Sequence, residues 1–188
     1  MRHLHLEKKG IRGLAIAESF TQHSKKSILA GVVMRRDLII DGFVIGKTTL
    51  SGDDATDEIL RMYEKLNRPD VSYVLISGVI ISLYNIIDIQ KLYKKLQIPI
   101  IAITYNDSSG IEDALKYHFN DAQSKIDEYK KLEERTRIKL DTNFDVYIRN
   151  EGCTLSDVQK LLNELTPQGS IPEPIRVAQL LARTILLD

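Results

Sequence analysis

Residues 71–79, VSYVLISGV, constrain the fold more than any other part of the chain. Apolar residues follow one another there instead of alternating with polar ones, which is typical of a strand covered on both faces of a sheet. A second continuous apolar run follows at 98–104, after helical spacing around 87–96. A strand, a crossover helix and a second strand predict parallel pairing with a right-handed crossover. We therefore expect a parallel unit at the centre of the sheet.

Three apolar runs precede this unit, and each of them predicts a strand. They lie at residues 11–19, 28–34 and 38–50, with polar turn residues between them. Because the connections are short, the three strands should form an antiparallel meander. Asp41-Gly42 lies inside the third run and predicts a bend or a bulge in that strand.

The rest of the chain is mainly helical in pattern. Helices are predicted after Asp53-Asp54, at 110–119, at 122–135, after Thr154 and at 175–187, with a short strand at 144–148. A three-strand meander followed by helix, strand, helix and strand is the order of a ribonuclease H-like fold. The chain has 188 residues, an ordinary size for one domain, so we predict a single α/β domain over residues 1–188. Its core should be a ribonuclease H-like mixed sheet with extra helices on the C-terminal side.

Charge and cysteine content exclude several classes of protein. The 26 Lys and Arg residues balance 26 Asp and Glu residues, so no global field attracts nucleic acid, although a local basic groove stays compatible with this balance. Basic and acidic residues alternate between 116 and 139, which favours a solvated helix over a nucleic-acid surface. The single cysteine, Cys153, allows no internal disulfide and indicates a reduced setting. The polar start and the lack of a membrane-length apolar run predict a cytoplasmic protein without a membrane partner.

Several longer strings point to a known family. They are GLAIAESF at 13–20, AGVVMR at 30–35, VLISGVIISLYNIIDI at 74–89 and GSIPEPIRVA at 169–178. Across nearly its whole length the chain resembles an archaeal family of uncharacterised proteins that is similar to endonuclease V. The resemblance implies a ribonuclease H-like fold, a nuclease ancestry, a link to DNA repair and DNA or RNA as partner. It also implies Mg²⁺ or Mn²⁺ as the cofactor of an active member.

The chain departs from that family's usual pattern where metal-binding carboxylates are expected. Ala17 and Glu18 stand where the first strand usually carries two aspartates, and Ser77 replaces the usual aspartate of the fourth strand. A neutral serine is a poor magnesium ligand. The resemblance leaves Glu18 and Asp54 as candidate catalytic residues, and Glu18, Asp53 and Asp54 as candidate metal ligands. The alternatives are a solvated strand end for Glu18 and a helix N-cap for one of the two aspartates.

Three further residues are candidates for substrate binding. Tyr84 and Asn85 follow the central strand, at the end where ligands of open α/β sheets gather. Asn85 has the alternative of supporting its own loop through side-chain to backbone bonds. Arg176 either reaches a phosphate or pairs with Glu173 in the last helix.

Two hypotheses for function follow. The first is an endonuclease V-like protein that associates with nucleic acid and in which metal-dependent phosphodiester hydrolysis is impaired or lost. The second is a non-catalytic interaction or scaffold protein that forms a homodimer through the C-terminal helix. Residues 175–187 support the second hypothesis because they are apolar on nearly every side of that helix.

Overall fold

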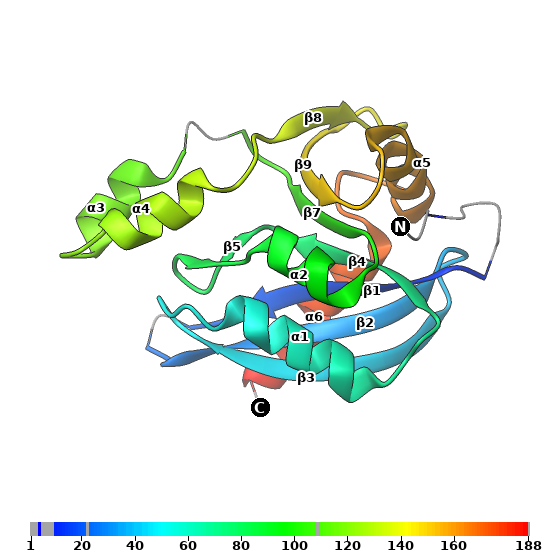
Figure 1. Ribbon diagram of the computed structural model, residues 1–188. Helices are drawn as coiled ribbons and strands as arrows, with labels where there is room; N and C mark the ends of the chain where they lie inside the picture. Colours follow the sequence, from blue (N-terminus) through cyan, green and yellow to red (C-terminus); the bar gives the residue numbers. More distant parts are fainter. Residues whose placement is uncertain (1–3, 5–9, 22, 108–109, 188) are drawn as a thin grey trace.

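A seven-stranded mixed sheet with strand order β3-β2-β1-β4-β7-β9-β8 forms the centre of the molecule (Figure 1). The computed structural model describes residues 4, 10–21, 23–107 and 110–187. The strands are β1 (Arg12–Ser19), β2 (Lys26–Arg35), β3 (Ile40–Thr49), β4 (Val71–Ser77), β7 (Ile100–Thr104), β8 (Thr136–Lys139) and β9 (Asp145–Glu151). Four of them are nearly continuous runs of buried residues, namely β1, β2, β4 and β7, because helices cover both faces of the sheet there.

The first three strands form the predicted antiparallel meander. β1 pairs with β2, and β2 pairs with β3, both antiparallel. The register shifts where Val33 pairs with Gly42 and Met34 pairs with Ile40, which leaves Asp41 as the extra residue of a bulge. The Asp41 carboxylate accepts hydrogen bonds from the side chains of two arginines, Arg12 and Arg68. The predicted irregularity at Asp41-Gly42 is therefore confirmed.

The parallel unit also lies where the sequence places it. β4 pairs in parallel with β1 on one side and with β7 on the other. Ile16 is directly opposite Ile76, so the next residues along the two strands, Ala17 and Ser77, are neighbours at the C-terminal ends. The two strand ends that hold the expected metal ligands in the related family thus lie side by side.

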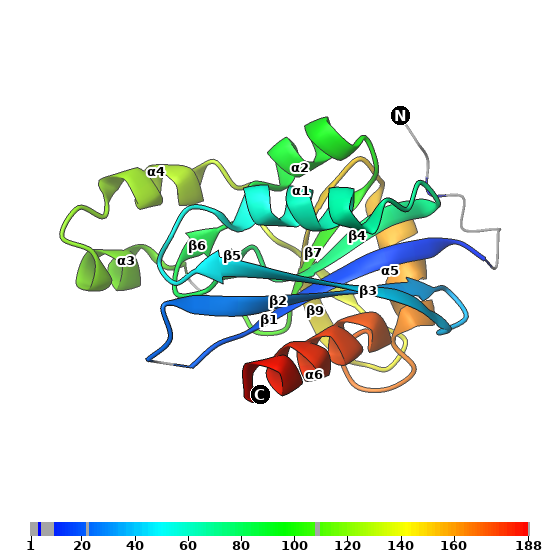
Figure 2. The ribbon, with the colours of Figure 1, turned by 90° about the horizontal axis from the view of Figure 1, so that it is seen from below.

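Helices form a layer on each face of this sheet. The helices are α1 (Ala55–Leu66), α2 (Ile89–Leu96), α3 (Glu112–His118), α4 (Gln123–Lys130), α5 (Leu155–Leu165) and α6 (Glu173–Leu187). Figure 2 shows α1 and α2 on one side of the sheet and α6 on the other. One core cluster joins Ile16 and Val74 to Ile59 of α1 and Leu92 of α2. A second cluster packs the other face of β4 and β7 against α5 and the start of α6.

One hairpin was not predicted, and one predicted helix is too long. A small hairpin of β5 (Ile80–Ile81) and β6 (Asn85–Ile86) interrupts the segment between β4 and α2. The helix predicted at 122–135 ends at Lys130, and β8 follows it as an edge strand. Local sequence gives a weak signal for β8 because Ile138 is its single buried residue. β8 is instead stabilised by antiparallel backbone pairing with β9.

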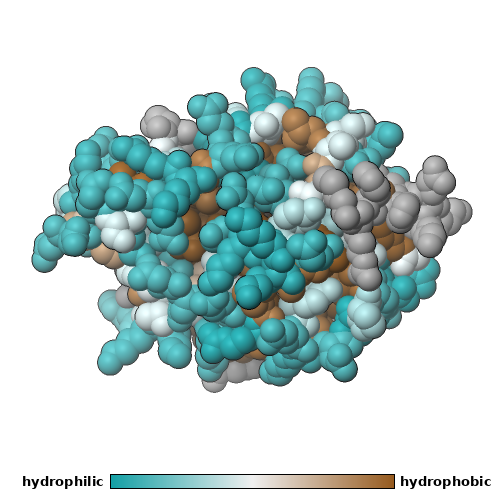
Figure 3. Space-filling view, in the orientation of Figure 1, coloured by the Kyte–Doolittle hydropathy of each residue, from teal (hydrophilic) through white to brown (hydrophobic). Residues whose placement is uncertain are grey.

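The α3–α4 pair extends from one end of the molecule (Figure 1). In the space-filling view most of this face is hydrophilic, and hydrophobic residues show between the helix pair and the main body (Figure 3). Among the described residues, no helix is both long and apolar enough to cross a membrane.

Candidate functional site

Ala17 and Ser77 lie under the C-terminal helix. Ala17 is buried in a cluster with Val32, Met34 and Ala178, the last of which belongs to α6. The Ser77 hydroxyl accepts a hydrogen bond from the side-chain amide of Gln179, with 3.3 Å between the two atoms. These side chains offer methyl, thioether, hydroxyl and amide groups and no carboxylate. Mg²⁺ and Mn²⁺ sites are built mainly from carboxylate oxygens, so these residues do not fit such a site.

Glu18 points to the opposite face of the sheet, as alternation along a strand requires. Its carboxylate accepts two hydrogen bonds from the Ser82 backbone N–H, at 2.7 and 2.9 Å, and a third from the Ser82 hydroxyl at 2.6 Å. The Ser82 hydroxyl also contacts the buried hydroxyls of Ser27 and Thr48. Glu18 is thus neither a solvated strand end nor part of a carboxylate cluster, because it holds the β5–β6 hairpin onto the sheet.

The turn of this hairpin has an unusual backbone. Ser82, Leu83 and Tyr84 all have positive φ angles, of 47°, 54° and 71°. Residues with side chains rarely adopt such angles, and the strain needs compensating contacts. The Ser82 carbonyl accepts from the Ser51 N–H at 2.7 Å, and the Tyr84 carbonyl accepts from the Lys125 ammonium at 3.2 Å. Together with Glu18, these contacts hold the turn in its strained form.

Asp54 occupies the N-cap position of α1 without capping it through its side chain. Its carboxylate instead accepts from the Thr49 N–H, the Thr49 hydroxyl and the Asn85 amide. Burial acts to raise the pKa of Asp54, but the hydrogen bonds from Thr49 and Asn85 outweigh it and lower the pKa below its usual value. The Asp54 carboxylate therefore stays charged inside a hydrogen-bonded loop.

Asn85 is fully buried and bonds to three parts of the chain. Its carbonyl oxygen accepts from the Ala55 N–H at 3.1 Å, which satisfies a donor in the first turn of α1. Its amide group donates to the Thr49 carbonyl and to Asp54. These contacts agree with the alternative interpretation of the sequence, in which the Asn85 side chain supports the surrounding loop. A role of Asn85 in substrate binding stays a prediction.

Asp53 forms an ion pair with Lys125 of α4, with 2.5 Å between the carboxylate oxygen and Nζ. Lys125 is buried, and its ammonium group also donates to the Gly52 carbonyl and lies 5.3 Å from the centre of the Phe119 ring. Sequence reasoning missed Lys125 because it is one of many charged residues in a region expected to be a solvated helix. The buried ammonium ties α4 to the loop between β3 and α1 and to the turn of the β5–β6 hairpin.

The remaining candidates make contacts within the protein. The Tyr84 ring lies 5.1 Å from the ring of His118 and 5.9 Å from that of Phe119. Arg176 pairs with Glu173, which is the alternative that the sequence left open. In the part of the chain that the structure describes, no three acidic, histidine or cysteine side chains lie close enough together to hold a metal ion.

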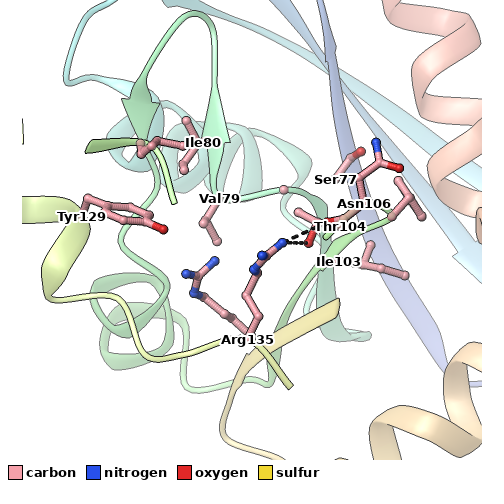
Figure 4. A pocket seen from close by; sticks show the side chains of 12 residues that line it. Ser77, Val79, Ile80, Ile103, Thr104, Asn106, Tyr129 and Arg135 are labelled. Atoms are coloured by element: carbon pink, nitrogen blue, oxygen red, sulfur yellow. Dashed lines mark hydrogen bonds between the residues drawn. The ribbon is translucent and has the colours of Figure 1, made fainter. Parts of the chain in front are cut away.

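A pocket opens beside Ser77, at the C-terminal ends of β4 and β7, with a volume of about 340 Å³. We call it the arginine pocket. Its lining residues are Ser77, Gly78, Val79, Ile80, Ile103, Thr104, Tyr105, Asn106, Ile111, Tyr129, Arg135 and Arg149. Figure 4 shows Arg135 directed toward Thr104 and Asn106, with Tyr129 facing the pocket from the side of α4. The sequence did not predict this site, because both arginines are far along the chain from β4. Arg135 directly precedes β8, and Arg149 lies on β9.

Comparison with known proteins gives a consistent result. A family model described as endonuclease dU matches residues 9–186. UPF0215 proteins from Pyrobaculum calidifontis and Methanosarcina barkeri are 36% and 34% identical to the chain over 170 and 183 residues. These alignments cover 90% and 96% of this chain, and 93% of each relative.

Solved structures support the fold. A protein of unknown function from Archaeoglobus fulgidus superimposes with a TM-score of 0.81 at 25% identity, over 94% of this chain and 99% of that one. Endonuclease V from Streptomyces avermitilis gives a TM-score of 0.66 at 15% identity, over 95% and 82% of the two chains. Endonuclease V from Ciona intestinalis, solved in complex with inosine-containing DNA, gives 0.64 at 13% identity, over 95% and 87%. The predicted ribonuclease H-like fold is confirmed, and the chain belongs to the endonuclease dU family.

Proposed function

We propose that this chain binds nucleic acid through its endonuclease V-like fold and lacks divalent-metal-dependent phosphodiester hydrolysis. Membership of the endonuclease dU family and the likeness to endonuclease V support a nucleic-acid ligand. The observation that carries the loss of hydrolysis is that Ala17 and Ser77, neither of them acidic, directly follow the paired residues Ile16 and Ile76 at the ends of β1 and β4. Action on nucleic acid also agrees with the cytoplasmic location expected from the sequence.

Metal-dependent hydrolysis needs carboxylates that hold ions against the attacking and leaving oxygens of the phosphate. The remaining acidic candidates are engaged in the fold: Glu18 with Ser82, Asp53 with Lys125 and Asp54 with Thr49. Freeing Glu18 for a metal would break the hydrogen bonds that hold the β5–β6 hairpin, and freeing Asp54 would break those at the start of α1. A compensating metal site built from these two carboxylates would therefore disturb the local structure.

Cleavage and binding can be measured on the same oligonucleotides. Single-stranded and double-stranded substrates containing deoxyuridine or inosine are incubated with Mg²⁺ or Mn²⁺, and affinity is followed by fluorescence anisotropy at several salt concentrations. We expect binding that weakens with salt, because phosphate contacts release counterions, and no cleavage above background. Preferential binding of the deaminated substrates would support the link to DNA repair. Metal-dependent cleavage that disappears in Glu18→Gln would contradict the proposal.

A matched pair of double variants tests the missing carboxylates. Ala17→Asp with Ser77→Asp restores two neighbouring acids, and Ala17→Asn with Ser77→Asn introduces groups of the same size without charge. We expect the first pair to bind Mn²⁺ measurably and the second to bind none, with circular dichroism used to confirm that both fold. Equal Mn²⁺ binding by the wild type and the aspartate pair would show that the two positions are not the missing ligands.

The exposed side of α6 favours a second candidate function, a homodimeric interaction protein. Ile175, Ala178 and Ala182 are buried against the sheet, whereas Leu180 is 52% exposed and Leu187 is 73% exposed. Light scattering over a wide concentration range tests this candidate. A dimer that dissociates in Leu180→Ser would support it, and a monomer at every concentration would contradict it.

A further inference from the structure

The arginine pocket concentrates positive charge in a chain that is neutral overall. Two of its lining residues are arginines, and none of the described lining residues is acidic. The whole chain has a formal net charge of zero. The charge of the pocket is therefore a local feature, of the kind that a search for basic runs in the sequence does not find.

Arg149 is the most informative residue of this pocket. Its guanidinium is half-buried, donates to the Glu133 backbone carbonyl and lies beside the Tyr129 side chain. Burial lowers the pKa of Arg149, although the Tyr129 side chain opposes this effect. Among the described residues, no carboxylate lies within ion-pair distance of it. A partly desolvated cation without a counter-ion is unfavourable, and an incoming anion would relieve that cost.

Arg135 is held with its guanidinium at the same pocket. It donates to the Asn106 carbonyl at 3.0 Å and contacts the Thr104 hydroxyl (Figure 4). Its guanidinium also lies over the Tyr147 ring, 5.0 Å from the ring centre. Its acidic partner, Asp107, is 77% exposed, so solvent weakens that ion pair. The Asn106 carbonyl and the Thr104 hydroxyl thus help to hold the Arg135 guanidinium at the pocket.

The neutral groups of the pocket complete a donor set. Ser77 and Tyr105 each contribute a hydroxyl, whereas the Thr104 hydroxyl already donates to the Tyr147 carbonyl at 3.2 Å. Burial raises the pKa of Tyr105, although the Ser77 hydroxyl opposes this effect, so the phenol stays protonated and able to donate. Planar guanidinium groups form bidentate hydrogen bonds to phosphate oxygens, and hydroxyl donors can add to them.

We propose that the arginine pocket binds the phosphate group of a nucleotide, with Arg149 and Arg135 as its charged ligands. The inference rests on the proposed nucleic-acid binding and assigns one of its contacts. Val79, Ile80, Ile103 and Ile111 form apolar walls against which the attached sugar or base can lie. A volume of about 340 Å³ is sufficient for a small ligand of this kind. The phosphate can come from a free nucleotide or from a nucleic-acid strand.

The test compares Arg149→Gln with Arg61→Gln. Both changes remove one positive charge, but Arg61 lies on α1, is 65% exposed and pairs with Glu58, outside the pocket. The probes are a labelled single-stranded oligonucleotide, the same oligonucleotide with a 5′-phosphate, deoxyuridine monophosphate, and deoxyuridine as the phosphate-free control. Comparing deoxyuridine monophosphate with the oligonucleotides separates a free nucleotide from a strand as the source of the phosphate, and comparing it with deoxyuridine shows whether the phosphate is needed.

We expect Arg149→Gln to weaken binding of the phosphate-bearing probes by about tenfold or more and to lower the salt slope by about one. Arg61→Gln should stay within about twofold of the wild type. Arg149→Lys keeps the charge without the fork of donors and should give an intermediate loss, which keeps the test valid if the glutamine variant does not fold.

Three outcomes would overturn this inference: unchanged affinity in Arg149→Gln, an equal loss in Arg61→Gln, or no binding of any phosphate-bearing probe by the wild type. The first two leave the proposed nucleic-acid binding intact, because the wild type still binds the oligonucleotide. The third overturns both proposals.

Discussion

Two regions at the same end of the sheet use charge in opposite ways. The acidic corner, formed by Glu18, Asp53 and Asp54 around the β5–β6 hairpin, has each carboxylate bonded to donors within the chain. The arginine pocket holds a half-buried guanidinium, that of Arg149, with no carboxylate partner among the described residues. Satisfied charges stabilise a fold, whereas a charge that lacks its counter-ion is available to a ligand.

This difference reverses the expectation from sequence. The acidic residues are the candidates for chemistry in the related family, but in this chain they stabilise a strained turn and the start of α1. The candidate for ligand binding is a group of residues from six separate stretches of the chain. Each of the following predictions tests one side of the comparison.

The largest effect is expected at the centre of the acidic corner. Asn85→Ala removes three hydrogen bonds of a fully buried side chain and leaves Asp54 and the Ala55 N–H without this partner. We expect the free energy of unfolding to fall by about 2–4 kcal/mol, measured by urea denaturation. The exposed Asn120→Ala is the control and should change it by less than about 0.5 kcal/mol. A small loss in Asn85→Ala would mean that the corner is not stabilised by these bonds.

Glu18→Gln tests the anchor of the hairpin. An amide keeps one acceptor but turns donors toward the Ser82 N–H and hydroxyl, so we expect a loss of about 1–2 kcal/mol in unfolding free energy. Hydrogen exchange of the Ser82 and Leu83 amides should accelerate as the turn opens more often. The exposed Glu134→Gln serves as the control. Unchanged stability, combined with lost metal binding, would assign Glu18 to a metal site instead.

Acid should weaken the corner through Asp54. The pKa of Asp54 is lowered in the folded chain, so its contribution is present above the unfolded value of 3.8 and is lost as pH falls through the folded pKa. The stability difference between wild type and Asp54→Asn should therefore be constant above about pH 5 and should shrink as the pH falls below 3.8. Urea denaturation at several pH values measures it. A difference that grows toward acid would contradict the hydrogen-bonded state of this carboxylate.

Arg176→Gln should have the smallest effect. The residue is exposed and its charge is paired with Glu173 one turn earlier, so we expect little change in stability or in oligonucleotide affinity. Fluorescence anisotropy measures the oligonucleotide affinity of Arg176→Gln and of Arg149→Gln under the same conditions. A loss in Arg176→Gln as large as that in Arg149→Gln would move the phosphate contacts from the arginine pocket to the start of α6.

The predictable parts of this structure are those with local or topological signals. The order of the strands is sufficient to place Ala17 beside Ser77, and Asp41-Gly42 marks the bulge of β3. The hairpin turn at Ser82, Leu83 and Tyr84 carries no glycine at its positive φ angles. Contacts with Glu18, 64 residues earlier, and with Lys125, 41 residues later, hold that turn, and a local pattern cannot reveal them. The same limit applies to Arg149, whose neighbours in the pocket come from β4, β7 and α4.

Binding and cleavage of a deoxyuridine-containing oligonucleotide, with EDTA or with Mn²⁺, test the central claim most directly. If the chain binds nucleic acid without metal-dependent hydrolysis, its affinity should not rise with Mn²⁺, which competes for the phosphates, and the oligonucleotide should remain intact. An affinity that increases with Mn²⁺, or cleavage that appears only with Mn²⁺, would contradict the account and show that a metal site forms despite Ala17 and Ser77.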